Sequence, residues 1–381
     1  MKVGFNARLL SSPTLRGWNR YAINLLVELT ELDVELVLYS DAPLHPSHLK
    51  RLERRGVTIA VRTGLRYPIW EQFWLPKRCS LDRLDVLHSP FNFGLPWISR
   101  CPRVLTLHDA IDQVFYPVRW TPAAFKGRLY HWSARTRAHR IITVSEHARG
   151  ELVGALGLAP RRITVIHEAA DPCFHKPSLS ADQERVRAAY GLHRPYLLYV
   201  GGWEGRKNVS ILPRSLALSG CDGLDLVLVG GRARETAEMT TLVESLGIPE
   251  RVRVLGWVDD ADLPALFAGA IAFAYPSFHE GFGLQLCEAM AVGCPVLAAD
   301  ATSLPEILGD GGVLFNPHEA ESLAALIRRV AHESDFRDDL IRRAQRRSLD
   351  FSWRRSALAT VKVYEAAMEN PHLVNRSQGH E

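Results

Sequence analysis

Short apolar runs alternate with longer amphipathic stretches along the whole chain. The runs are rich in Val, Ile, Leu and Tyr, and Gly, Pro or polar residues end most of them. This alternation predicts strands separated by helices, the pattern of parallel sheets in α/β domains. We expect strands at 3–6, 34–39, 86–89, 104–107, 141–144 and 163–166, and then at 196–200, 226–229, 252–255, 271–275, 295–298 and 313–315.

The two sets of strands predict two domains, because 381 residues exceed the usual size of one compact core. A proline-rich stretch, 171–195, separates them. We expect one domain over 1–172 and a second over 173–350, each a doubly wound parallel sheet. Residues 351–369 have helical spacing, and the polar tail 370–381 is predicted to be disordered.

Composition narrows the class of protein. The chain is 47% apolar and 23% charged, which is ordinary for a soluble globular protein. Its start has no secretory leader pattern, and no apolar run reaches membrane-spanning length. The six cysteines show no zinc-type or Cys-x-x-Cys spacing, so we expect reduced thiols and a cytoplasmic protein.

Charge is unevenly spread. Residues 1–175 carry 24 Lys and Arg against 15 Asp and Glu, about +9, whereas 176–381 carry 22 against 27, about −5. The stretch 113–145 contains no acid, and an aromatic and basic segment that includes Trp70, Phe73, Trp74, Lys77 and Arg78 precedes it. We expect peripheral contact with an anionic membrane, or else a solvated helix face. Nucleic acid is not expected, because no recognition motif accompanies the charge.

Two glutamates, Glu280 and Glu288, bracket a glycine turn at the start of an apolar helix. The turn is Gly281-Phe282-Gly283, and Leu284 follows it. A helix start offers backbone N–H groups and the positive end of the helix dipole to an anion. Carboxylates accept hydrogen bonds from hydroxyl groups. The motif therefore predicts a site for a phosphate joined to a hydroxyl-rich group.

A second motif follows the first strand of the second half. Gly201 and Gly202 allow close backbone approach, and Arg206 and Lys207, followed by Asn208, bring two cations to the start of the next helix. Such a group of charges suits a departing diphosphate. We expect Lys207 to be an exposed cation that matters to turnover much more than to folding.

These two motifs resemble the retaining GT-B glycosyltransferases of glycosyltransferase family four, with its Glu-x7-Glu and G…RKN signatures. The resemblance implies two Rossmann-like domains facing a central cleft, with a last helix crossing back to the first domain. It implies that Arg206 and Lys207 stabilise the leaving diphosphate, that Glu280 holds the donor sugar, and that Glu288 holds the ribose. Gly201, Gly202, Asn208 and the turn 281–284 would complete the donor site.

The first half carries weaker parts of the same resemblance. Gly17, in Gly17-Trp18-Asn19-Arg20-Tyr21, would contact donor phosphates, although Asn19 replaces a glycine of the family pattern. His108-Asp109 resembles a mannosyltransferase-like subgroup in which the histidine faces the transferred sugar. His108 is therefore a catalytic candidate, and Asp109 and Ser145 are candidates on the acceptor side.

Other chemistries fit less well. Neither glycine-rich segment has the Gly-x-Gly-x-x-Gly spacing of a dehydrogenase. Asp260 and Asp262 match a metal-binding Asp-x-Asp, but we interpret them as helix-capping residues. His45 and His48 lack an accompanying acid or cysteine ligand. We therefore expect no metal and no cofactor other than the nucleotide sugar.

The resemblance implies an enzyme that moves a sugar from a nucleotide diphosphate donor to a hydroxyl of a glycan or lipid-linked acceptor. The pathway would be polysaccharide or glycoconjugate biosynthesis, and mannose from GDP-mannose is slightly preferred as donor. Two alternatives remain open: a GT-B sugar-nucleotide 2-epimerase, and a catalytically silent sugar-nucleotide-binding partner.

Overall fold

The computed structural model describes the whole chain except residues 14–16, 53–55, 116–121, 177–179 and 370–381. The predicted disorder of the tail thus lies outside the described residues. The chain divides into two compact units, Met1–Glu168 with Ser352–Glu381, and Ala169–Phe351. The division falls four residues before the expected 172, and η4 (Pro172–His175) packs within the second unit, where Phe174 meets the ring of Phe267.

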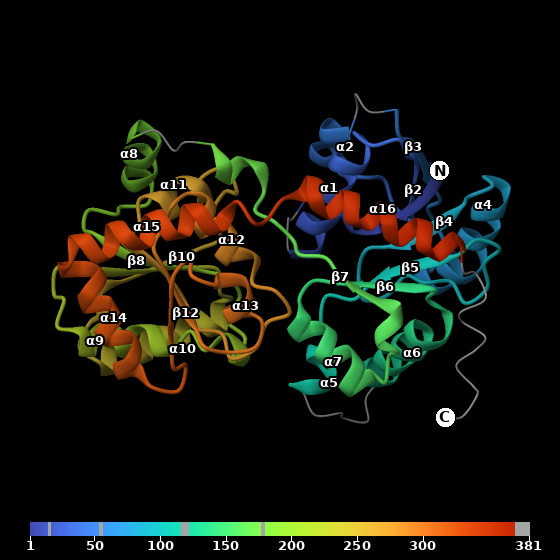
Figure 1. Cartoon of the computed structure of the whole chain (residues 1–381). Helices are drawn as coiled ribbons and strands as arrows, with labels where there is room; N and C mark the ends of the chain where they lie inside the picture. The colour runs from blue at the N-terminus through green and yellow to red at the C-terminus, as the bar shows by residue number, and fades with distance from the viewer. Residues whose placement is uncertain (14–16, 53–55, 116–121, 177–179, 370–381) are drawn as a thin grey trace. The chain divides into compact units, whose positions relative to one another are not determined.

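The first unit is built on a parallel sheet with helices on both faces (Figure 1). Among the described residues the strand order is β3-β2-β1-β4-β5-β6-β7. The strands are β1 (Lys2–Asn6), β2 (Glu35–Ser40), β3 (Thr58–Val61), β4 (Val86–Ser89), β5 (Arg103–Thr106), β6 (Arg140–Thr143) and β7 (Ile163–Val165). The order reverses between β1 and β4, and in open α/β sheets ligands bind at the carboxyl ends of the strands beside such a reversal.

The second unit repeats this architecture in its described residues with the order β10-β9-β8-β11-β12-β13. Its strands are β8 (Tyr196–Val200), β9 (Asp225–Val229), β10 (Val252–Gly256), β11 (Ala272–Tyr275), β12 (Val296–Ala299) and β13 (Val313–Phe315). Every residue of β8, β9, β11 and β12 is buried, as expected for strands covered on both faces. The reversal lies between β8 and β11.

Helices connect the strands in both units. In the first unit they are η1 (Arg8–Ser11), α1 (Gly17–Leu29), α2 (Pro46–Leu52), α3 (Tyr67–Ile69), the π-helix η2 (Trp70–Trp74), α4 (Leu75–Leu81), α5 (Ile111–Val114), α6 (Pro122–Arg137), α7 (Glu146–Leu156), η3 (Pro160–Arg162) and α16 (Trp353–Glu369). In the second they are η4, α8 (Ser180–Ala189), η5 (Gly205–Lys207), α9 (Ile211–Ser219), α10 (Ala233–Ser245), η6 (Pro249–Arg251), α11 (Leu263–Ala268), α12 (Leu284–Ala291), α13 (Leu304–Leu308), α14 (Ala320–His332) and α15 (Ser334–Ser348).

The last helix, α16, belongs to the first unit. It packs against α1 and along β4, β5 and β6 (Figure 1). The Tyr364 hydroxyl lies 2.7 Å from His88 Nδ1, and His88 Nε2 lies 2.8 Å from Thr106 Oγ1, which in turn is 3.1 Å from the Tyr21 hydroxyl. Burial lowers the pKa of His88 to about 3, so its ring is neutral and can accept at one nitrogen and donate at the other. This buried chain fixes α16 to the sheet.

The described helices include none that is both long and apolar enough to cross a bilayer. All six cysteines are free thiols, and five of them are buried.

Candidate active site

The two predicted motifs of the second unit meet at the reversal point of its sheet. Arg206 and Lys207 lie on η5, directly after β8, and Glu280 lies in the loop after β11. β8 and β11 are neighbours at the reversal of the strand order, and side-chain contacts from Arg206 and Lys207 to Glu280 join the loops that follow them. The backbone joins them as well, since Phe278 N–H donates to the carbonyl of Arg206 at 2.8 Å.

Glu280 is held by three donors. Lys207 Nζ lies 2.5 Å from Glu280 Oε1, Arg206 Nη1 lies 3.1 Å from Oε2, and the Tyr275 hydroxyl lies 3.0 Å from Oε1. Arg206 Nη1 also donates to the carbonyl of His279 at 2.9 Å. Glu280 and Lys207 are both only 7% exposed. The expectation that Lys207 is an exposed cation was therefore wrong, because the neighbouring carboxylate compensates its burial.

Burial by itself would raise the pKa of Glu280, but Lys207 and Arg206 outweigh it and lower the pKa to about 2. Burial lowers the pKa of Arg206, whereas Glu280 raises it, and the net direction is upward. Burial raises the pKa of Tyr275 well above its usual range. At neutral pH Glu280 is therefore a carboxylate, Arg206 is a cation and Tyr275 is a neutral phenol.

The glycine turn after Glu280 is fixed by the segment that precedes α13. Ser303 Oγ lies 3.0 Å from the carbonyl oxygens of both Glu280 and Phe282, and Glu280 N–H donates to Thr302 Oγ1 at 3.0 Å. Gly283 has φ 99°, and a Cβ there would lie 2.9 Å from Leu304 Cδ2, so both the conformation and the space require glycine. The turn leads into α12, whose first residue is Leu284 and on which Glu288 is buried.

The loop after β8 rests on the loop after β9. A Cβ on Gly230 would lie 2.1 Å from the carbonyl oxygen of Gly201, and a Cβ on Gly231 would lie 2.8 Å from the ring of Trp203. Trp203 Nε1 is buried without a hydrogen-bond partner among the described residues. The sequence analysis missed Trp203, although the Gly230-Gly231 pair that makes room for its ring was a visible signal.

Asn208 and Gly202 have local structural roles. Asn208 adopts a left-handed conformation with φ 51°, and its side-chain amide donates to the carbonyl of Pro317 at 2.8 Å. The carbonyl of Gly202 accepts a 2.5 Å hydrogen bond from the Tyr199 hydroxyl. These contacts anchor the loop that carries Arg206 and Lys207. Contact of Asn208 and Gly202 with a donor stays a prediction.

In the first unit, His108 follows β5 and is 4% exposed. Its Nδ1 lies 3.0 Å from Glu168 Oε1, its Nε2 lies 3.0 Å from the carbonyl oxygen of Pro90, and its ring stacks on Trp18. Both ring nitrogens thus face oxygen acceptors. Asp109 Oδ1 accepts from the N–H of Ile111 at 3.3 Å, at the start of α5.

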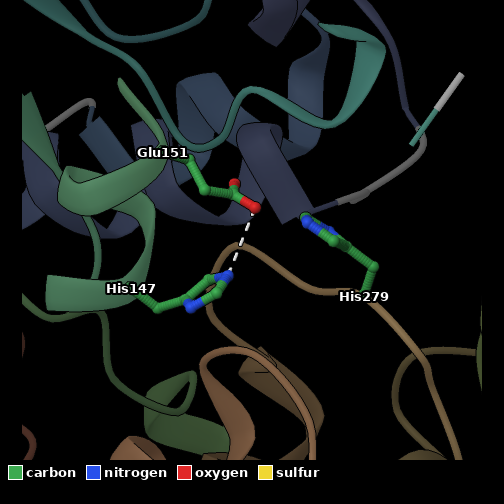
Figure 2. A group of neighbouring side chains, drawn as sticks. All are labelled: His147, Glu151 and His279. Atoms are coloured by element: carbon green, nitrogen blue, oxygen red, sulfur yellow. Dashed lines mark hydrogen bonds and ion pairs between the residues drawn. The ribbon is translucent and has the colours of Figure 1, made fainter. Parts of the chain in front are cut away.

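Ser145 and Gly17 lie at helix starts. Ser145 caps α7, with its Oγ accepting from the N–H of Ala148 at 3.0 Å. Gly17 is the first residue of α1, is exposed, and has open space around its Cβ position. On α7, His147 Nε2 lies 3.2 Å from Glu151 Oε1 (Figure 2). Figure 2 also draws His279, the second-unit residue whose carbonyl contacts Arg206.

The first unit also holds a group of aromatic and charged side chains that the sequence analysis did not identify. It includes residues that follow β1 and β4 in the chain. The guanidinium of Arg8 lies 3.7 Å from the ring centre of Tyr67, whose edge meets Phe93, which stacks on Tyr130. Glu71 is 3% exposed and accepts from Gln72 Nε2 at 3.1 Å. Burial raises the pKa of Glu71 to about 7.

Asp262, one of the two residues of the Asp-x-Asp match, makes contacts other than a helix cap. Asp262 stands at the start of α11, but its carboxylate binds Arg185 Nη2 and the Tyr190 hydroxyl, each at 2.8 Å, and makes no capping bond. Asp262 thus occupies the predicted position at the start of a helix, but the prediction that its side chain caps the helix was wrong. The ion pair with Arg185 balances the negative charge of the Asp262 carboxylate within the second unit.

Comparison with known families agrees with the two halves of this architecture. The profile described as "Glycosyltransferase Family 4" matches residues 15–173, and that described as "Glycosyl transferases group 1" matches residues 182–347. The chain is 33% identical to the O-antigen chain mannosyltransferase B of Escherichia coli, over 96% of this chain and all of that protein. It is 27% identical to a D-inositol 3-phosphate glycosyltransferase of Corynebacterium aurimucosum, over 92% and 91% of the two chains.

Solved structures show the same fold. HepE of Anabaena, in complex with UDP and glucose, superposes with a TM-score of 0.78 at 21% identity, over 96% of this chain and all of that one. WaaG, a glycosyltransferase involved in lipopolysaccharide biosynthesis, superposes with a TM-score of 0.70 at 17% identity over the full length of both chains. Both likenesses concern the two-domain architecture.

Proposed function

The chain belongs to glycosyltransferase family 4 and has the GT-B fold, and on this basis we propose that it transfers mannose from GDP-mannose to a hydroxyl of a glycan or lipid-linked acceptor, with retention of the anomeric configuration. The cluster of Arg206, Lys207 and Glu280 at the reversal point of the second sheet carries the proposal.

In this proposal the diphosphate of the donor binds beside Arg206 and Lys207, where two cations offset the charge that develops as it leaves. Glu280 keeps both cations at the loop edge in the absence of donor, and its free lone pairs accept hydrogen bonds from sugar hydroxyls. A carboxylate whose pKa is about 2 is a weak base. The acceptor proton therefore goes to an oxygen of the departing diphosphate and not to Glu280.

The remainder of the donor would extend from this cluster along α12. Glu288 lies one helical turn beyond Leu284 and is placed in the proposal at the ribose. Backbone N–H groups of Gly281, Phe282 and Gly283 would meet the phosphates at the start of α12. Contact of Gly17 with the donor phosphates stays a prediction. Trp203, whose indole N–H is buried and unpaired among the described residues, is a further polar group at this edge of the sheet.

The choice of mannose is supported by the mannosyltransferase relative and by the His108-Asp109 pair. HepE was solved with UDP and glucose, so UDP-linked sugars are the competing donors. In the structure the Nε2–H of His108 donates to the carbonyl oxygen of Pro90. In the proposal it donates to the transferred sugar instead. Glu168 holds the other nitrogen of the ring.

The acceptor is proposed to bind to the first unit at the carboxyl ends of β1, β4 and β5. Tyr67, Phe93 and Tyr130 present ring faces and edges, while Arg8 and Glu71 offer a donor and a carboxyl group. Aromatic rings beside hydrogen-bonding groups suit a sugar, which has apolar faces and hydroxyl edges. Asp109 and Ser145 remain candidates on the acceptor side. Polysaccharide or glycoconjugate biosynthesis is the setting in which such an acceptor occurs, often linked to a lipid.

The test is a panel of nucleotide sugars with and without a mannose-containing oligosaccharide acceptor, in excess EDTA. We expect GDP-mannose to give the highest turnover, the product to keep the α-configuration by NMR, and EDTA to leave the rate unchanged. Conversion of the donor to its 2-epimer without acceptor would favour an epimerase, and binding without turnover would favour a silent partner. A rate restored only by Mg²⁺ or Mn²⁺ would contradict the proposed metal independence.

A further inference from the structure

The outer surface of the first unit carries an apolar stripe where solvent-facing residues are usually polar. Along the continuous helical segment formed by α3, η2 and α4, the residues at spacing four are Ile69, Phe73, Lys77 and Leu81. Ile69 is 47% exposed, Phe73 is 72% exposed and Leu81 is 66% exposed. The opposite face holds the buried core of this segment, including Trp70, which is fully buried. The sequence analysis placed Trp70 with Phe73 in the segment expected to contact a membrane, and the burial of Trp70 corrects this for Trp70.

The loop before β5 extends the stripe. Gln72 lies beside Phe73 in the chain, and its side-chain oxygen accepts from the N–H of Trp97 at 2.8 Å. This bond places the loop next to η2. Ile98, which follows, is 80% exposed, and Arg100 is exposed as well.

Helix α6 completes the surface. Trp132 meets the edge of Trp97, with ring centres 5.5 Å apart, so α6 lies against the same loop. Phe125, Arg128, Trp132 and Arg135 lie three or four residues apart on one side of α6, and all four are exposed. Phe125 is 71% exposed. We call the exposed side chains of these three segments the aromatic-basic surface.

The charge of this surface has one sign. The sequences 95–103 and 122–137 contain no Asp or Glu, and the acid of α3, η2 and α4, Glu71, is 3% exposed. Lys77, Arg100, Arg128 and Arg135 are exposed on it. An exposed apolar stripe on a soluble monomer marks an interaction site. Basic residues interleaved with aromatic and aliphatic ones match the headgroup region of an anionic bilayer, where the charges meet phosphate and the rings enter the acyl boundary.

We propose that the aromatic-basic surface binds the first unit to an anionic lipid bilayer, without any membrane-crossing helix. The inference rests on the proposed function only in that a lipid-linked acceptor would be presented at such a surface. The binding itself requires neither donor nor acceptor. Phe73, Ile98 and Phe125 enter the boundary region, and the lysine and arginines face the anionic headgroups. Two of the three segments overlap the stretches for which the sequence predicted membrane contact, 70–78 and 113–145, and the structure adds the loop before β5.

Sedimentation with vesicles tests the proposal on the full chain. One set of vesicles is phosphatidylcholine alone, and the other contains about a third phosphatidylglycerol. We expect binding to the anionic vesicles at low salt, weak binding to the zwitterionic ones, and loss of binding at high salt, since screening weakens the charge contribution. The absence of binding to anionic vesicles at low salt would overturn the proposal.

Two variants locate the surface. Phe73→Ser combined with Phe125→Ser should weaken vesicle binding roughly tenfold or more, because each ring contributes buried apolar area. Arg128→Ser combined with Arg135→Ser should weaken binding and flatten its salt dependence. Trp257→Ser with Leu349→Ser is the matched control, because these second-unit residues are 70% and 72% exposed, and it should bind like the parent.

Three outcomes separate this inference from its competitors. Parent-like binding by both surface variants would place the membrane contact elsewhere. A dimer in light scattering that the Phe73 and Phe125 substitutions abolish, with no vesicle binding, would assign the surface to a second copy. Transfer to a water-soluble acceptor should be unchanged in all variants, so the enzymatic proposal stands or fails separately.

Discussion

Glu280 accepts hydrogen bonds from Lys207, Arg206 and Tyr275 within a buried cluster, and it therefore has two separable roles. As a partner of two cations it contributes to the stability of the second unit. As an acceptor at the edge of the sheet it is proposed to bind the donor sugar. A substitution in this cluster affects both, so activity and stability must be measured together.

We predict that Lys207→Met lowers kcat by about 10²–10³-fold at saturating donor, the loss typical of one removed transition-state donor. The free energy of unfolding should also fall, by roughly 1–3 kcal/mol, because Glu280 stays buried with Arg206 as its one remaining cation. Urea denaturation and steady-state rates measure the two effects.

The control for this prediction is Lys176→Met, because Lys176 is an exposed lysine of the second unit. This substitution should change neither kcat nor the free energy of unfolding. Adding Glu280→Gln to Lys207→Met should recover part of the lost stability and none of the rate. Full activity in Lys207→Met would remove this residue from the mechanism.

The two glutamates should differ in their effect on product binding. Glu280→Gln is predicted to depress turnover while leaving the affinity for free GDP nearly unchanged, because its proposed partner is the sugar. Glu288→Gln should weaken GDP binding by roughly 1–3 kcal/mol through a lost charged hydrogen bond to the ribose. Calorimetry with GDP compares both. Equal losses of affinity would refute this division of roles.

At the scale of elements, the sequence predicted twelve of the thirteen strands in the described residues and missed β3. The twelve are apolar runs bounded by turn residues, whereas β3 (Thr58–Val61) lies at the sheet edge with three of its four residues exposed. β7, β10 and β13 are edge strands too and were predicted, so the edge position alone does not explain the omission, and β3 is the least buried of the four. Its pairing with β2 is visible only in three dimensions.

The candidate site divides in the same way. Glu280, Arg206 and Lys207 could be found because charged residues beside glycine turns have a recognisable order in the sequence. Their mutual contact, and the burial of Lys207, depend on the adjacency of β8 and β11, which are far apart in the chain. Glu71 was missed because a lone acid within an aromatic helix has no motif, and its burial follows from packing alone.

Glu71 lies on the π-helix η2 and supplies a pH-dependent prediction at this scale. Burial raises its pKa from 4.5 to about 7, despite the nearby charges of Arg8 and Lys126. A carboxyl with a raised folded-state pKa gives stability that is fully present below the unfolded pKa and is lost as pH rises through the folded pKa. The protein therefore loses this contribution to its unfolding free energy as the pH rises from about 4.5 to about 7, and the loss is at most about 3 kcal/mol.

Glu71→Gln keeps the shape of the side chain without its charge. The difference in unfolding free energy between Glu71→Gln and the parent should shift in favour of the variant by roughly 1–3 kcal/mol when the pH is raised from 5 to 8. Unfolding midpoints of both proteins at both pH values measure it. Glu365→Gln, an exposed glutamate on α16, is the control and should show no such trend. A stability difference that does not vary with pH would show that Glu71 is not the titrating group.

For the molecule as a whole, the two units differ in how the chain builds them. The first is discontinuous, since it needs α16 from the far end of the sequence, and Tyr364 on that helix bonds His88 in the sheet. The second is the single stretch Ala169–Phe351, and it contains Arg206, Lys207, Glu280 and Glu288. The proposed donor contacts are thus nearly complete within one continuous segment, whereas the proposed acceptor groups belong to the first unit.

We therefore predict that a fragment comprising residues 169–351 folds alone and binds GDP, with an affinity lower than that of the full chain by no more than about tenfold, or 1.4 kcal/mol, for the missing Gly17 contact. It should show no transfer. Circular dichroism, cooperative urea unfolding and calorimetry with GDP measure these properties, and the fragment carrying Glu288→Gln is the control that should lose binding. A folded fragment that fails to bind GDP, beside a full chain that binds it, would mean that the first unit supplies most of the donor contacts and that the placement of the nucleotide along α12 is wrong.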